Sequence, residues 1–150
     1  MYVKTVMDAF DGRTVEGQRY FHHAGDVMLP DFMEVKRRGG VIKAGVPLEI
    51  DLIGEWTLPN DAGRGAWLVQ VKYTTRPASA QDIQTFLAQS AGTSTEKQYA
   101  QVIHWYVSKG GYSTEAIHAL QEAQIFYSDR AAFNALANLF HFHGLPGQPE

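Results

Sequence analysis

The spacing of apolar residues changes at Pro77, and this change constrains the fold more than any other feature of the sequence. Before Pro77, apolar and polar residues alternate in short runs such as 66–74, "AWLVQVKYT", which is the pattern of a β-strand. After Pro77, Ile83, Phe86 and Leu87 recur at the spacing of one helix face. Strands followed by alternating helices and strands predict an α/β fold with a mixed central sheet.

The strands before Pro77 are predicted to form an antiparallel meander. Residues 32–45 alternate on both sides of Gly39-Gly40, a dipeptide that signals a hairpin between two short strands. The next segment, 47–56 ("PLEIDLIGEW"), is predicted as one strand, and 66–74 as the central strand. The whole range 32–74 therefore predicts consecutive strands paired in chain order.

Helices are predicted where turn and cap residues bracket a helical pattern. One helix is expected from Thr14, its N-cap, to Gly25, its stop, and a second from Ser79, its N-cap, to Gly92. The remaining elements are predicted as strands over 101–109 and 125–129 and helices over 113–124 and 130–144.

Length and composition indicate one domain over 1–150. The sequence pattern further predicts a helical N-terminal part over 1–31 and a tail over 145–150. No long apolar run or signal-peptide pattern is found, so we expect a soluble cytoplasmic protein with no membrane partner. With 0 cysteines, disulfides and thiolate metal sites are excluded. The net charge of −3 argues against coating nucleic acid through bulk charge, but leaves room for a local basic path.

Two polar residues, Gln70 and Lys72, interrupt an otherwise apolar strand pattern and project from the same face, because side chains alternate along a strand. By the same rule Glu49 and Asp51 share one face of the preceding predicted strand. Pairing of these strands would align the two polar faces at about 5 Å. Polar groups are costly in a core unless something binds them, so the sequence predicts a shared pocket.

The residue types in this predicted pocket suit a hard divalent cation, Mg²⁺ or Mn²⁺. Asp51, the amide oxygen of Gln70 and the main-chain carbonyl of Val71 are the candidate ligands. Lys72 would orient or deprotonate a water, and Glu49 would assist as a further ligand or proton acceptor. The plainer alternatives are a surface carboxylate at Glu49, a structural ion pair between Asp51 and Lys72, and an ordinary strand residue at Gln70. Metal-assisted phosphodiester hydrolysis is the reaction that this chemistry fits best.

These segments resemble a known enzyme family. The run "EIDLIGEW", a turn, "WLVQVKYT" and the following helix look like the core of PD-(D/E)XK nucleases, with Asp51 as the motif aspartate, Gln70 in place of the acid and Lys72 as the lysine. The later segment 106–136 is similar to the corresponding part of Mrr-type restriction endonuclease catalytic domains. The resemblance covers about 32–140.

The resemblance implies a restriction-endonuclease-like three-layer core and a metal-dependent DNA endonuclease of restriction, defence or repair type. Glutamine at the acid position is a variant known in that branch, so it does not by itself imply an inactive site. Families of this fold often carry an acidic residue on an early helix. Here Glu16 is the candidate, and the N-terminal part otherwise departs from the pattern.

Four basic residues, Lys36, Arg37, Arg38 and Lys43, are expected beside this site. Cations placed there would position a phosphate backbone without reading bases, and the alternative is a solvated hairpin. Arg76 follows the lysine strand and is a second candidate phosphate contact, or part of an ordinary turn.

The end of the strand at 101–109 supplies another candidate, because open α/β sheets often present ligand-binding groups at strand ends. The resemblance implies that Ser108 helps at the site, with Lys109 next to it.

Other functions remain open on the sequence alone. The main rival is a nuclease-like domain that has lost catalysis and serves as a nucleic-acid or protein interaction module, which the neutral Gln70 favours. Another is a nuclease that acts on RNA or branched DNA. Cutting both strands of a duplex favours a homodimer, and targeting favours an additional domain or subunit.

Overall fold

The computed structural model describes residues 2–37, 41–43, 46–48 and 50–142. Its centre is a five-stranded sheet with the order β3-β6-β7-β8-β9. β6 runs antiparallel to both of its neighbours, β3 and β7, and the last two strands run parallel to β7, which is the central strand. The strands are β3 (Glu34–Arg37), β6 (Leu52–Thr57), β7 (Arg64–Lys72), β8 (Gln101–Ser108) and β9 (Phe126–Ser128). The predicted α/β fold with a mixed sheet is therefore confirmed.

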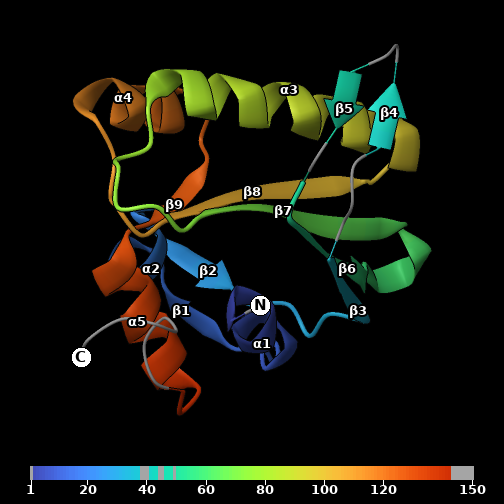
Figure 1. Cartoon of the computed structure of the whole chain (residues 1–150). Coiled ribbons are helices and arrows are strands. Elements are labelled where there is room, and N and C mark those ends of the chain that lie inside the picture. The colour runs from blue at the N-terminus through green and yellow to red at the C-terminus, as the bar shows by residue number, and fades with distance from the viewer. Residues whose placement is uncertain (1, 38–40, 44–45, 49, 143–150) are drawn as a thin grey trace.

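Helices cover both faces of this sheet (Figure 1). Two helices, α3 (Ala80–Lys97) and α4 (Thr114–Glu122), lie on one face. The opposite face is covered by α1 (Tyr2–Asp8), α2 (Gly17–Phe21) and α5 (Arg130–Leu139), together with the hairpin of β1 (Thr14–Glu16) and β2 (Asp26–Met28). A short 3-10 turn, η1 (Pro59–Asp61), joins β6 to β7. Within the described ranges, no helix combines the length and apolar character that crossing a membrane requires.

Alternation along β7 divides the buried residues between two cores. Trp67 and Val69 point into the layer of α1, α2 and α5, where Trp105, Phe21 and Phe133 pack around them. Aromatic rings dominate this core, and Trp67 and Trp105 meet edge to face with their centroids 5.8 Å apart.

The other face of β7 looks toward α3 and α4. Ala66 and Leu68 pack there with Ile83 and Phe86 of α3. Because side chains alternate along a strand, this same face also carries Gln70 and Lys72, which follow Leu68 by two and four residues. This face thus carries an apolar cluster under α3, and polar side chains gather where β7 ends.

The predicted hairpin across Gly39-Gly40 is wrong in its pairing, and these two glycines lie outside the described residues. β3 pairs with β6, whereas β4 (Val41–Lys43) pairs with β5 (Val46–Leu48) in a separate two-stranded sheet. β5 packs against α3. Alternation identifies a strand but not the strand that pairs with it. The sequence therefore predicted these strands but not their pairing.

The prediction of one continuous strand over 47–56 is also wrong. β5 ends at Leu48 and β6 begins at Leu52, with a bend at Asp51. The Asp51 side chain accepts a hydrogen bond from the Val71 N–H, and a short carboxylate that bonds to main chain competes with regular pairing.

The helix predicted from Thr14 to Gly25 is reduced to α2, because Thr14 belongs to β1. Gly17 permits the chain that follows α2 to pass close to the start of this helix. A Cβ at Gly17 would overlap the Gly25 carbonyl oxygen and would lie 2.7 Å from the His23 carbonyl oxygen.

Two helix ends also differ from prediction. α3 begins after Ser79 as expected but continues past Gly92 to Lys97. α5 ends at Leu139, and the predicted stop at Gly144 lies outside the described residues, as does the predicted tail over 145–150.

Candidate functional site

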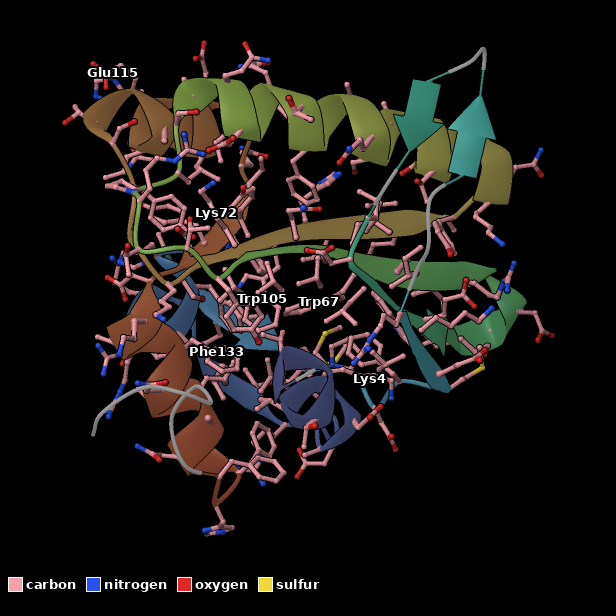
Figure 2. All side chains as sticks on the ribbon, viewed as in Figure 1. Lys4, Trp67, Lys72, Trp105, Glu115 and Phe133 are labelled. Carbon is pink, nitrogen blue, oxygen red and sulfur yellow. The ribbon has the colours of Figure 1, made fainter. Side chains whose placement is uncertain are left out.

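A pocket of about 190 Å³ lies at the end of β7, between the sheet and α3. Figure 2 shows Lys72 on the α3 side of the sheet, with Trp67 and Trp105 on the other side. Polar side chains from β7 and from one face of α3 converge on this space. The lining residues are Gln70, Val71, Lys72, Asp82, Thr85, Phe86, Gln89 and Tyr106.

The Gln70 amide oxygen is buried in this region and has no hydrogen-bond partner among the residues that the structure describes. An acceptor in this state loses its water without replacing it, which costs about 1–3 kcal/mol. Native proteins keep few such groups, and a bound water, an ion or a ligand is the usual partner. The Gln70 Oε1 atom is therefore the atom of the pocket that most clearly lacks a partner.

Asp51 approaches the same end of β7 from the neighbouring strand. Leu52, which pairs with Val69, is the first residue of β6, and Asp51 stands at the bend directly before it. Its Oδ2 accepts a hydrogen bond of 2.9 Å from the Val71 N–H. Asp51 is therefore anchored on the β7 main chain, one residue along from Gln70, and its predicted approach to the Gln70 side chain stays a prediction.

Lys72 makes an ion pair with Asp82 of α3. The distance from Nζ to Oδ2 is 3.6 Å, and the two side chains are 15% and 28% exposed. The ion pair that the structure shows for Lys72 is thus with Asp82, which sequence analysis did not consider.

Asp82 is fixed by the start of α3. Ser79 and Asp82 form a capping box, in which Ser79 N–H donates to Asp82 Oδ2 at 2.9 Å and Asp82 N–H donates to Ser79 Oγ at 3.1 Å. Burial raises the pKa of the Asp82 carboxyl, but the Ser79 hydrogen bonds and the charges of Lys72 and Arg76 outweigh it and hold the pKa below its usual value. Asp82 is thus ionised at neutral pH.

Tyr106 of β8 contributes a phenol to the pocket. Burial and the nearby charges of Asp82 and Asp51 raise the pKa of Tyr106 to about 12. The phenol therefore stays protonated and is a hydrogen-bond donor at neutral pH. The charges of Asp82 and Asp51 thus both reach the Tyr106 phenol.

The remaining expected substrate contacts are only partly brought together. Arg76 is exposed, and its charge reaches Asp82. Lys36 and Arg37 are exposed on the edge strand β3, where the Lys36 Nζ lies 3.5 Å from the Glu34 Oε1. Ser108 is fully buried and its hydroxyl donates to the Gly111 carbonyl at 2.8 Å, so it stabilises a turn and offers no surface to a phosphate.

Three other expectations fall outside what can be placed. Glu49 and Arg38 are not among the described residues, and neither is the side chain of Lys43.

Glu16 is described: it is an exposed residue of β1, in the layer across the sheet from α3, and does not join the pocket. Among the residues that the structure describes, no three His, Cys, Asp or Glu side chains come together in the manner of a metal site.

Sequence analysis did not identify Asp82 or Tyr106 as site residues. The spacing Ser79-x-x-Asp82 before an apolar run is a capping-box pattern and identifies Asp82 as fixed in position. Nothing in the linear sequence places it opposite Lys72, since that contact depends on how α3 crosses the sheet.

Comparisons of the chain with protein-family models, with curated proteins and with solved structures found no match. The site must therefore be interpreted from its own geometry.

Proposed function

We propose that this chain is a metal-dependent endonuclease domain that hydrolyses phosphodiester bonds in DNA, with a restriction-endonuclease-like core. The observation that carries the proposal is the buried Gln70 Oε1, which has no partner among the described residues and lies in the pocket with Lys72, while the Asp51 carboxylate bonds to the Val71 N–H between them. The α/β sheet with helices on both faces is compatible with this core.

Gln70 Oε1, Asp51 and the Val71 carbonyl would hold Mg²⁺ or Mn²⁺, which accept oxygen ligands and keep several waters. The orphaned amide oxygen fits this role because coordination would replace the partner that it lacks. When bound, such an ion lowers the pKa of a coordinated water and neutralises charge on a phosphoryl oxygen.

The chain's own side chains would act around that centre. The Lys72 ammonium lies at the same pocket and would orient the attacking water and balance negative charge on the phosphoryl group. Tyr106 would donate a hydrogen bond from its protonated phenol. Arg76, exposed in the turn after β7, would contact the phosphate backbone outside the pocket.

Substitution of the two central residues tests the proposal. Asp51→Ala and Lys72→Ala should each abolish Mn²⁺-dependent cleavage of duplex DNA while leaving the circular dichroism spectrum unchanged. Lys109→Ala, a cation at the next strand end, serves as the control and should retain cleavage. Full activity in either central variant would remove the proposal.

A second candidate function is a nuclease-like module without catalysis, which binds nucleic acid or protein. The engagement of Asp51 with the Val71 N–H favours it, because one carboxylate oxygen is already occupied. Calorimetric titration with Mn²⁺ separates the two functions: the enzyme predicts heat of binding that Asp51→Ala removes, and the module predicts none.

The substrate class is tested by direct comparison. We expect plasmid DNA to be cut in preference to single strands, RNA and a four-way junction, and preference for one of the others would reassign the substrate. Cleavage of both strands would further require two sites, so we expect a homodimer on DNA, measurable by light scattering with and without duplex.

A further inference from the structure

Lys72 makes an ion pair with a charged residue that does not belong to β7. Gln70, its neighbour on the same face of the strand, is neutral, and Asp51 is bonded to the Val71 N–H. Among the described residues, the carboxylate in ion-pair contact with Lys72 is that of Asp82, which comes from α3.

We propose that Asp82 is a positioning residue that holds the Lys72 ammonium in the pocket beside Gln70. This inference rests on the proposed nuclease function for its catalytic consequence, but its structural part concerns only Lys72 and Asp82. Asp82 thereby replaces, from a helix, the negative charge that the strand lacks at Gln70.

The geometry of Asp82 suits this role. Its Oδ2 accepts a hydrogen bond from the Ser79 N–H at 2.9 Å and lies 3.6 Å from the Lys72 Nζ, which is an ion-pair distance. The hydrogen bond at the start of α3 therefore fixes the carboxylate before Lys72 reaches it, so only the lysine side chain has to be ordered.

The surroundings of the pair strengthen the contact. Both side chains are mostly buried, and such pairs are screened less by salt than pairs at the surface. The carboxylate also lies in the first turn of an 18-residue helix, where the helix dipole favours negative charge.

The chain offers variants that separate positioning from helix capping. Asp82→Asn keeps an oxygen for the Ser79 N–H but removes the charge, whereas Ser79→Ala removes the serine half of the capping box and leaves the carboxylate beside Lys72. Asp82→Glu restores the charge and keeps a residue that suits this capping position.

Two readouts are measured on the full chain. The first is the rate at which an amine-acylating reagent modifies Lys72, followed by mass spectrometry and normalised to Lys109. The second is kcat and KM for cleavage of linear duplex DNA with Mn²⁺.

Asp82→Asn should raise the Lys72 labelling rate by about threefold, the scale of a lost partly exposed ion pair. It should lower kcat by about 10- to 100-fold, with KM little changed, as expected for loss of a group that orients a catalytic side chain. Ser79→Ala should lower the melting temperature and leave labelling and kcat unchanged, and Asp82→Glu should recover both.

Wild-type labelling and wild-type kcat in Asp82→Asn would overturn the inference. Equal effects of Asp82→Asn and Ser79→Ala would also overturn it, because they would assign the effect to capping. If the unsubstituted chain cuts no DNA, the proposed function fails, and the labelling rates alone decide whether Asp82 holds Lys72.

Discussion

Gln70 is a residue that the fold would be expected to avoid. Its side-chain oxygen is buried without a partner at a strand position where an apolar side chain would pack against Phe86 and Tyr106. Sites that bind or react commonly retain such unfavourable groups, because the ligand supplies the missing interaction.

Replacement of this side chain should exchange function for stability. Gln70→Met keeps the length of the side chain and removes the orphaned oxygen, so the free energy of unfolding should rise by about 1 kcal/mol. Mn²⁺ binding should be lost in the same variant. Urea denaturation and calorimetric titration measure the two effects.

The control is Gln89→Met, an amide in the same pocket that is contributed by α3. It should neither stabilise the chain as much nor abolish Mn²⁺ binding. A Gln70→Met variant that is less stable than the parent would show that its oxygen has a partner after all.

At the scale of elements, the loops that follow β7 and β8 lock each other in place. Lys109 N–H donates to the Lys72 carbonyl at 3.0 Å, and Ala78 N–H donates to the Gly111 carbonyl at 2.9 Å. Gly110 allows the close contact: a Cβ there would lie 2.5 Å from the Thr75 carbonyl oxygen. The turn that carries Arg76 is therefore held by main chain.

Gly110→Ala should disturb this arrangement, because the added methyl group meets backbone that cannot rotate away. We expect a loss of about 1–3 kcal/mol in the free energy of unfolding. Lys109→Ala, in the same turn, keeps every main-chain contact and should cost much less. Equal stability of Gly110→Ala and the parent, measured by urea denaturation, would contradict this account of the turn.

The elements themselves were largely accessible to sequence analysis. β7 was predicted from its alternation, and the starts of α3 and α4 from their caps Ser79 and Ser113. The pairing of the strands was not accessible. β3 pairs with β6 across 14 intervening residues, and the sequence carries no signal for this long-range pairing. The bend at Asp51 was missed for a related reason: its cause is a hydrogen bond to Val71, on another strand.

The candidate site was predictable only where it lies on one strand. Alternation placed Gln70 and Lys72 on a common face, as observed. Asp82 and Tyr106 reach the pocket from α3 and β8, and their approach depends on the packing of layers that no local pattern encodes.

For the whole molecule, His104 couples stability to pH. Burial lowers the pKa of His104 below its usual value, and its ring packs edge-on against Phe86. Below the ordinary pKa of about 6.5, the unfolded chain binds a proton at His104 more readily than the folded chain does. This contribution to stability is therefore complete above that pH and is lost as the pH falls toward the lowered folded value.

His104→Leu should remove this contribution. The free energy of unfolding should fall less between pH 7 and pH 5 in His104→Leu than in the parent, because the variant has no ring to protonate. Urea denaturation at the two pH values measures the difference. An identical fall in both proteins would show that His104 titrates alike in the folded and unfolded states.

The central claim is that the end of β7 holds a hard cation between Asp51 and Gln70. A crystal structure of the chain soaked in Mn²⁺, with data collected for the anomalous signal of manganese, tests it most directly. The account predicts an anomalous peak within coordination distance of Gln70 Oε1 and the Asp51 carboxylate. A map with no peak there, and with Gln70 Oε1 still unpartnered, would contradict it.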